Sequence, residues 1–401
     1  MRSWALDREA LARRNQRVAQ ALHQPSLRHR FRNGFLRLIA KAPVSPQRGK
    51  SNRILIIRPD HLGDMLLTTP AIKAIKAQRP ELSIHVLCGD WCADILANFE
   101  EVDRVLTLPF PGFRREAAGG GNPYLLALQS ARKLRRVGYD SAIIMRPDHW
   151  WGALLAFLAG IQERIGYDAP GAAPFLTAAL RLEHQHVVEQ NLRLAGTFAD
   201  IPRGDAVRLD FPLQSVDCDR IDARLSDLGI PAGAPIICIH PGSGASSKLW
   251  RADKWGTVAD ALAQEHSAAI VFTGTAGEKA IIEGIAGKMK AGSSIIAGST
   301  SVGELAALYR RALIVLGPDS GAMHIAAAVH RPTVALFGPA DPIEFAPWGD
   351  PRRQAVVTSD IACRPCRILD WREDDRDWHP CVRDISVGQV LAAARRVLGD
   401  G

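Results

Sequence analysis

The chain has 401 residues, of which 47% are hydrophobic and 23% are charged, as in a globular protein with a real core. No apolar run is long enough to span a membrane, no apolar signal segment follows the N-terminus, and the seven cysteines form no disulfide-framework pattern. We therefore expect a cytoplasmic protein rather than an integral membrane protein or a secreted one.

The net charge of +8 is concentrated at the start of the chain. Residues 1–50 hold 12 lysines and arginines and two acidic residues, a net charge of +10, so the rest of the chain is slightly acidic. Apolar residues such as Phe31 and Leu38 are interleaved with the arginines, as in helices that lie on an anionic bilayer surface. The alternative is an arm that docks on the folded body. We expect no nucleic-acid partner, because no nucleic-acid-binding motif accompanies the charge.

From residue 53 onward, short β-branched runs alternate with helical stretches, which predicts βαβ units and parallel sheets covered on both faces. In the first half we expect helices over 65–78, 91–99 and 150–158 and one ending at 136, with strands over 53–58, 83–88, 104–109 and 141–146. In the second half we expect a last helix over 387–398 and strands over 236–240, 268–274, 294–298, 313–317 and 333–338.

The stretch 210–235 interrupts this alternation with proline, glycine and acidic residues, and we interpret it as the linker region between two domains. The predicted organisation is a basic extension (1–50), a first doubly wound domain (51–215) and a second one (216–401). We expect a cleft between the two domains.

The sequence Arg-Pro-Asp-His occurs twice, each time where a predicted strand ends. The first copy begins at Arg58 and is followed by Gly63-Asp64 at the start of a helix, and the second copy begins at Arg146. Ligands of doubly wound sheets bind beyond the carboxyl ends of the strands. This rule places several polar side chains at the expected cleft, namely Asp60, His61, Asp64, Asp148 and His149. The alternative is that these are polar turns without a function.

Three loops in the second half have the composition of anion-binding sites. A glycine-serine loop leads to Lys248, and Asp319-Ser320-Gly321 opens an apolar helix whose N-terminus can hold a negative charge. The alternatives are an ordinary turn for the first loop, an N-cap role for Asp319 and an interior histidine for His324. In the third loop, Glu278 is expected either to accept from ribose hydroxyls or to favour the start of its helix.

Two common enzyme classes lack their sequence signature. No G-x-G-x-x-G follows the first strand of either predicted domain, which argues against a dehydrogenase. No G-x-S-x-G elbow is present, so an α/β-hydrolase is unsupported.

Several stretches together resemble the glycosyltransferase family 9 heptosyltransferases. In the first half they are "LGDMLLTTPAIKAIKAQRPELSIHVLC" and "GYDSAIIMRPDHWWGALLAFLAGIQERIGYD". In the second half they are "HPGSGASSKLWRADKWGTVADAL", "FTGTAGEKA" and "PDSGAMHIAAAVHRPTVALFGPADP", in the order of the family's donor-domain motifs. The resemblance covers residues 53–395, and residues 1–50 lie outside it.

The resemblance implies a GT-B fold, in which two doubly wound Rossmann-like domains face a central cleft, with the acceptor domain first and the nucleotide-sugar domain second. The family transfers heptose from ADP-heptose to the lipopolysaccharide inner core, with inversion and without a metal, so no cofactor is expected. We expect an ADP-sugar donor and a lipid-linked or oligosaccharide acceptor. Residues 1–50 would then hold the enzyme at the inner face of the inner membrane.

The resemblance also implies residue roles. Asp64 corresponds to the catalytic base, Lys248 to the lysine near the phosphates, and Glu278 to the glutamate that faces the ribose. The other expected donor-binding residues are Ser243, Asp319, Ser320, Gly321, Ala322 and His324. Expected acceptor contacts are Arg58, Asp60, His61, Arg146, Asp148 and His149. These roles agree with the chemistry, because inverting transfer needs one base for the acceptor hydroxyl and charge stabilisation for the departing ADP.

A cysteine-rich stretch near the C-terminus contains four potential zinc ligands, Cys363, Cys366, His379 and Cys381. The spacing after the first pair is loose, and the final pair is too close for an ordinary zinc finger. We therefore interpret the stretch as reduced thiols, with a zinc site as the alternative.

Two other functions have the same two-domain architecture. A non-hydrolysing nucleotide-sugar epimerase would turn over its nucleotide-sugar without an acceptor. A non-catalytic nucleotide-sugar-binding module would bind the donor without turnover, although the presence of both Asp64 and Lys248 argues against it.

Overall fold

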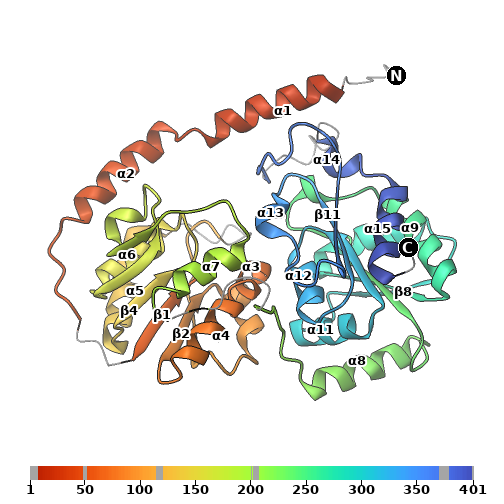
Figure 1. Cartoon of the computed structure of the whole chain (residues 1–401), viewed down its shortest axis with the longest axis horizontal. Helices are drawn as coiled ribbons and strands as arrows, with labels where there is room; N and C mark the ends of the chain where they lie inside the picture. Colours follow the sequence, from red (N-terminus) through yellow and green to blue (C-terminus); the bar gives the residue numbers. More distant parts are fainter. Residues whose placement is uncertain are drawn as a thin grey trace. The chain divides into compact units, whose positions relative to one another are not determined.

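The structure is a computed structural model of the chain, and it describes residues 8–47, 52–113, 121–199, 201, 207–369 and 379–399. The chain divides into two compact units. The first-sheet unit is Pro25–Val207, and the second-sheet unit combines Met1–Gln24 with Arg208–Gly401. Each unit contains one six-stranded sheet with helices packed on it (Figure 1).

The first sheet is entirely parallel, and its strands lie in the order β3-β2-β1-β4-β5-β6. After their first residues, Arg53 and Ser141, its two central strands consist of aliphatic residues buried on both faces, because helices cover the sheet from either side. The strands are β1 (Arg53–Ile57), β2 (Ser83–Cys88), β3 (Arg104–Thr107), β4 (Ser141–Ile144), β5 (Glu163–Tyr167) and β6 (Ala178–Leu180).

The helices of the first-sheet unit form two packed groups, one containing α5 and α6 and the other α4 and α7. Trp151 and Phe175 lie fully buried in the core of this unit. Its helices are α2 (Leu27–Ile39), α3 (Leu62–Leu66), α4 (Thr69–Gln78), α5 (Pro123–Val137), α6 (Trp150–Leu158) and α7 (Val187–Ala195), with 3₁₀ turns η1 (Asp90–Leu96) and η2 (Ala173–Phe175).

The second sheet repeats the topology of the first. Its strands lie in the order β9-β8-β7-β10-β11-β12, again all parallel. This is the doubly wound arrangement of Rossmann-like domains, in which the strand order reverses beside the first strand. The strands are β7 (Ile236–Ile239), β8 (Ala269–Gly274), β9 (Ser293–Ala297), β10 (Ile314–Pro318), β11 (Thr333–Phe337) and β12 (Gln354–Thr358).

The helices of the second-sheet unit also form two groups, α9 with α10 and α15, and α8 with α11 and α12. Residue Ala12, from the first helix of the chain, belongs to the core of this unit. The helices are α1 (Arg8–His23), α8 (Ser215–Asp227), α9 (Ala252–His266), α10 (Lys279–Ala286), α11 (Val302–Arg311), α12 (Gly321–Ala328), α13 (Pro342–Phe345), α14 (Pro380–Arg383) and α15 (Val387–Leu398), with η4 (Ser246–Lys248) and η5 (Ala276–Glu278).

The predicted fold class is confirmed, and so are the nine predicted strands within a few residues at each end. The sequence reasoning missed β5, β6 and β12, which lie at or next to the outer edge of their sheets. The predicted helix over 65–78 is instead two helices, because Pro70 lacks an N–H and lies in the first turn of α4. The predicted helix over 91–99 is the 3₁₀ turn η1.

The interpretation of 210–235 as a linker was wrong. Residues Ser215–Asp227 form α8, which packs against α11 in the second-sheet unit. Ile221 and Leu225, one helical turn apart, are buried, and Arg311 pairs with Asp222 at 3.0 Å. Of the acidic residues that indicated a loop, Asp219, Asp222 and Asp227 lie on the exposed side of this helix, whereas Asp217 is buried beside Gly303. Within the described ranges, no helix combines the length and apolarity needed to cross a membrane.

Candidate active site

The two Arg-Pro-Asp-His sequences meet at one edge of the first sheet. β1 and β4 are neighbours, with Ile57 opposite Ile144. The first sequence follows β1 directly, and the second follows β4 after Met145. The prediction that each copy lies where a strand ends is therefore confirmed, and the two strands are neighbours. This pair is the point where the strand order reverses, which is where ligands bind in doubly wound sheets.

Ion pairs join the two sequences. The Arg58 Nε lies 2.7 Å from Asp60 Oδ2, and its Nη2 lies 3.3 Å from Asp64 Oδ1. Arg146 pairs with the other carboxylate oxygen of Asp60 and, at 2.6 Å, with Asp148. Asp60 is thus held by one arginine from each sequence, and Arg58 connects it to Asp64.

Asp60 is a charged group inside the protein. Burial alone would raise the pKa of its carboxyl, but the adjacent Arg58 and Arg146 outweigh burial and hold that pKa below its usual value. The Arg58 Nη1 also donates to the main-chain oxygen of Met145, at 2.9 Å. Arg58 and Asp60 are both buried, so in this structure they position other groups.

Asp64 is the more accessible carboxylate of this cluster. It lies in the first turn of α3, and its side chain is 28% exposed, against 5% for Asp60. Asp148 is 68% exposed, and Arg146 lies over the ring of Phe113 at 5.2 Å. The charged side chains that can meet a ligand at this edge therefore include those of Asp64, Arg146 and Asp148.

The two histidines of these sequences have different surroundings. His61 is partly exposed, and its ring centroid lies 6.2 Å from that of Trp91. His149 is buried among Phe110, Phe113 and Trp151, and burial lowers its pKa to about 3, so the ring is neutral. Its role as an acceptor contact stays a prediction.

The predicted phosphate loops meet at the corresponding edge of the second sheet. β7 and β10 are neighbours, with Ile239 opposite Leu316, and the loops that follow them contain Lys248 and Asp319. Lys248 Nζ lies 2.5 Å from Asp319 Oδ2, and both side chains are largely buried. Ser243 Oγ donates to the main-chain oxygen of Asp319 at 3.5 Å.

The N-terminus of α12 lies directly after Asp319. Its N-cap residue is Ser320, so the alternative that Asp319 serves as the N-cap was wrong. The Ser320 hydroxyl is buried and has no hydrogen-bond partner among the described residues. The first N–H groups of a helix lack intrahelical partners and attract anions. Ala322 and His324 are buried in the next turn.

Glu278 has a local structural role. Its carboxylate accepts from the Thr275 backbone N–H at 2.7 Å and from the Thr275 hydroxyl at 2.9 Å, forming a capping box. Its carboxylate also lies against Gly242, where an added Cβ would come within 2.1 Å of it. Gly242 is therefore required beside Glu278, and the ribose contact stays a prediction.

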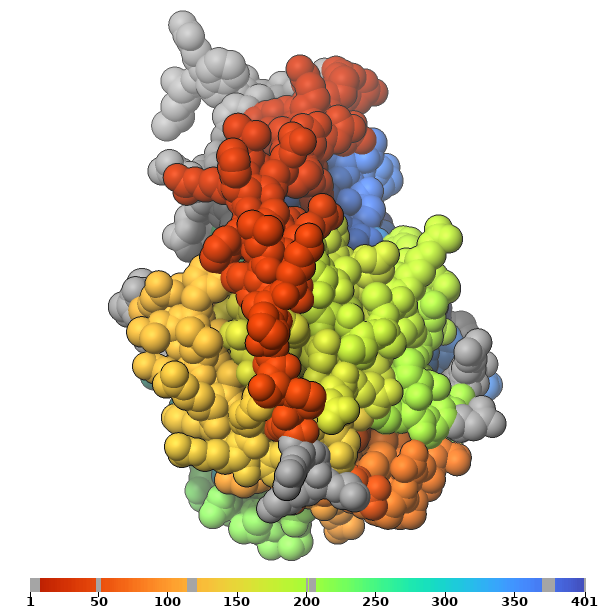
Figure 2. Space-filling model, turned by 90° about the vertical axis from the view of Figure 1, so that its left-hand side faces the viewer, coloured from red at the N-terminus to blue at the C-terminus, as the bar shows by residue number. Residues whose placement is uncertain are grey.

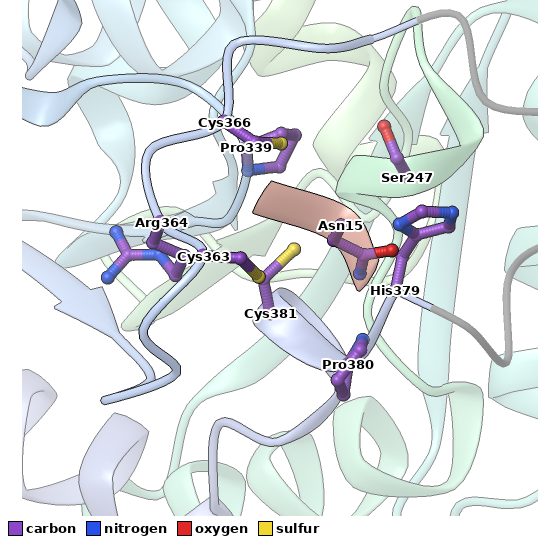
Figure 3. A pocket seen from close by; sticks show the side chains of 9 residues that line it. All are labelled: Asn15, Ser247, Pro339, Cys363, Arg364, Cys366, His379, Pro380 and Cys381. Atoms are coloured by element: carbon purple, nitrogen blue, oxygen red, sulfur yellow. The ribbon is translucent and has the colours of Figure 1, made fainter. Parts of the chain in front are cut away.

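Cys363, Cys366, His379 and Cys381 line a small pocket together with Asn15 of α1 (Figure 3). The sulfur atoms of Cys363 and Cys381 lie close together in this view. Burial raises the pKa of Cys381 to about 12 and also raises that of Cys363, so these thiols are protonated. Within the residues that the structure describes, no group of three potential ligands is arranged to hold a metal ion.

The sequence reasoning missed two residues at these edges. Trp91 Nε1 donates to the main-chain oxygen of Asp60 at 2.9 Å, and it follows β2, so the rule on strand ends could have identified it. His240 follows β7, and its Nδ1 lies 3.1 Å from the Thr273 hydroxyl. Burial lowers the pKa of His240, and its Nε2 lies 4.0 Å from Glu278.

Comparisons with known proteins agree with this architecture. The model of the family "Glycosyltransferase family 9 (heptosyltransferase)" matches residues 127–374. Lipooligosaccharide heptosyltransferase 2 of Haemophilus ducreyi is 28% identical over 359 residues, which cover 86% of this chain and 99% of that protein. A family 9 glycosyltransferase from Veillonella parvula superposes with a TM-score of 0.73 at 20% identity, over 89% of this chain and 100% of the other. The ADP-heptose lps heptosyltransferase II of E. coli superposes with a TM-score of 0.67 at 22% identity, over 86% and 98%.

Proposed function

Because this chain belongs to glycosyltransferase family 9, we propose that it moves a heptose from ADP-heptose to a lipopolysaccharide-core or related glycan acceptor. The relatives that match it over most of their length are named heptosyltransferases of lipooligosaccharide or lipopolysaccharide. A structural neighbour, the E. coli heptosyltransferase WaaC, was solved with ADP-2-deoxy-2-fluoro heptose. Family membership favours a transferase over the epimerase and over the binding module.

The observation that best supports the donor assignment is the Lys248–Asp319 pair beside the N-terminus of α12. ADP leaves with negative charge on its phosphate oxygens, and a lysine with unpaired helix N–H groups stabilises such charge. The buried hydroxyl of Ser320 is a further donor for an incoming oxygen. We propose that these groups hold the pyrophosphate, that Asp319 contacts the sugar, and that no metal is needed for the ADP to depart.

Asp64 is proposed as the base. The acceptor hydroxyl oxygen attacks the anomeric carbon while the bond from that carbon to the ADP oxygen breaks, which inverts the configuration. Asp64 takes the proton of the attacking hydroxyl. Its exposure and its ion pair with Arg58 support this role, because the carboxylate is accessible and also held in position. Arg146 and Asp148 are proposed to contact acceptor hydroxyls.

The test is an assay with ADP-heptose and a panel of lipopolysaccharide-core acceptors, in which ADP release and heptose transfer are both quantified. A transferase releases ADP in proportion to the heptose found on the acceptor. Conversion of the donor without any acceptor would support the epimerase instead. Binding of ADP-heptose without turnover on any acceptor would support the binding module.

We also propose that the enzyme works in the cytoplasm, at the inner face of the inner membrane, where a lipid-linked acceptor would be found. The basic N-terminal segment supports this location.

A further inference from the structure

The two helices of the N-terminal segment differ in how they pack. α1 uses its apolar side to dock on the second-sheet unit, where Leu11, Ala12 and Ala19 are buried. Arg8 Nε lies 2.7 Å from Asp384, and the Gln16 side chain donates to the Ala362 main-chain oxygen at 2.8 Å. Leu11, Ala12 and Ala19 are therefore part of the folded core and are not available for a membrane, and Leu22 is the one large apolar residue of α1 that stays exposed.

α2 docks on the first-sheet unit through a narrow face. Leu36 is fully buried there, and the Arg32 guanidinium lies 5.1 Å from the centre of the Trp150 ring. Phe35 lies at the border of this packed face, and its ring centroid is 5.7 Å from that of Tyr124. Figure 2 shows α2, in red-orange, lying along the outside of this unit.

The opposite face of α2 is an exposed apolar stripe. Leu27, Phe31, Phe35 and Leu38 are 68%, 78%, 50% and 67% exposed. An α-helix turns by about 100° per residue, so these four side chains lie within about 80° of one another around the helix axis. The centre of this stripe is roughly opposite Leu36. Exposed large apolar residues that gather on one helix face mark an interaction surface.

Arginines border this stripe on both sides. Around the helix axis, Arg28 follows Phe35 on one side of the stripe, and Arg30 and Arg37 follow Leu27 on the other side. All three arginines are exposed. No acidic residue occurs from residue 10 to residue 47. A helix with an apolar stripe between cationic borders is suited to the boundary between acyl chains and anionic head groups.

From this arrangement we infer that α2 is the membrane-docking element of the protein, with its Leu27–Leu38 stripe inserted into an anionic lipid surface. A second copy of the chain is a less suitable occupant of the stripe. A two-fold contact through this face would bring the same arginines of two copies together, and like charges repel. Anionic head groups complement these arginines, and the acyl chains cover the stripe.

The inference uses the proposed function only to explain why docking is useful, because a lipid-linked acceptor would lie in the same surface. It assigns the membrane contact to one face of α2 rather than to the whole basic segment of residues 1–50. It also rules out deletion of residues 1–50 as a test, because that deletion would uncover the core that α1 closes.

The test uses the full chain with Leu27→Gln, Phe31→Gln and Leu38→Gln together, sedimented with vesicles of phosphatidylglycerol and phosphatidylcholine. Phe35 is kept because it packs on Tyr124. The triple variant should lose about ten-fold or more in vesicle partitioning. The matched control, Leu228→Gln with Ile281→Gln and Ile343→Gln, changes three other exposed apolar residues and should bind like the wild type.

Charge is tested separately. Wild-type binding should weaken with added salt and on vesicles of phosphatidylcholine alone, and Arg28→Gln with Arg30→Gln and Arg37→Gln should weaken it at low salt. Turnover of the stripe variant on a short, water-soluble acceptor should equal that of the wild type, so failure of the docking inference is distinct from failure of the proposed chemistry. Equal vesicle binding by the stripe variant and the wild type would overturn the inference. So would a wild-type dimer in light scattering that the stripe variant converts to a monomer.

Discussion

The two sheet edges where the strand order reverses have the same topology but different chemistry. At the first edge, between β1 and β4, side chains of opposite charge pair with one another, and Arg58 holds both Asp60 and Asp64. At the second edge, between β7 and β10, one pair, Lys248 with Asp319, lies beside a helix N-terminus. The first edge holds an accessible carboxylate in a fixed position, and the second presents donors to an anion.

In this fold the topology fixes where a ligand binds, whereas the loop residues fix which chemistry takes place there. An ion-paired carboxylate suits proton transfer from a hydroxyl group. A lysine and backbone N–H groups suit a pyrophosphate. The following experiments test whether the two edges divide the reaction in this way.

The largest expected effect is that of Asp64→Asn. Turnover should fall by roughly 10²- to 10⁴-fold, the usual range for the loss of a general base, while the Kd for ADP-heptose measured by calorimetry should stay unchanged. Asp148→Asn is the comparison, because it changes an exposed carboxylate at the same edge and should raise the acceptor KM more than it lowers kcat. Near-wild-type turnover of Asp64→Asn would remove the first edge from the chemistry.

The second edge is tested by Lys248→Met. A charge-assisted hydrogen bond to phosphate contributes about 1.5–3 kcal/mol, so the Kd for ADP-heptose should rise about 10- to 100-fold. Loss of the lysine also leaves Asp319 buried without its cation, which destabilises the fold.

Adding Asp319→Asn to Lys248→Met should therefore restore thermal stability but not donor binding. Lys279→Met is the matched control, because this lysine of α10 is exposed and pairs only loosely with Glu283 at 3.9 Å. If Lys248→Met binds ADP-heptose as tightly as the Lys279→Met control, the donor site lies elsewhere.

The pH dependence of stability should differ between His149 and Asp60. Burial lowers the pKa of His149 to about 3 from the usual 6.5, so the unfolded chain takes up a proton below pH 6.5 that the folded protein does not bind. This contribution to stability is present above pH 6.5 and is lost as pH falls toward 3, at about 1.4 kcal/mol per pH unit. Asp60 also has a lowered pKa, but its contribution is lost only below its usual value of 3.8.

Urea unfolding of wild type and His149→Leu at pH 7 and pH 5 measures this difference. Between pH 7 and pH 5, the free energy of unfolding should fall by about 2 kcal/mol more in the wild type than in the variant, because the variant has no proton to gain at that position. Equal losses of the free energy of unfolding in the two proteins would mean that the His149 ring is accessible and protonated in the folded protein. That state is the one expected of an acceptor contact at the surface.

The smallest expected effect is that of EDTA, which should leave the activity unchanged, because Lys248 and the N-terminus of α12 supply the positive charge for the departing ADP. Activity that collapses and returns with magnesium would contradict this. Activity that returns only with zinc would make the pocket of Cys363, Cys366, His379 and Cys381 a metal site, and metal analysis of the purified protein checks this independently.

Much of the fold could be predicted from the sequence, because its signals are local. A buried aliphatic run such as residues 54–57, followed by glycine or charged residues, predicts a parallel strand with a polar loop at its end. The same pattern located Asp64 and Lys248. The outer strand β12 was missed because buried and exposed residues alternate along it and no continuous buried run marks it. α8 was missed because its acidic residues resemble a loop, and its only large apolar residues on the buried side are Ile221 and Leu225.

Nine of the strands, the loops at their ends and the residue types in those loops follow from local sequence patterns, because each depends on neighbours along the chain. Which loops meet depends on the tertiary fold. Arg146 reaches Asp60 because β4 lies beside β1, and strand order depends on contacts distant in sequence. The tertiary fold also decided that the apolar side of α1 is buried while the stripe of α2 stays exposed, because burial depends on what the rest of the fold places against each helix.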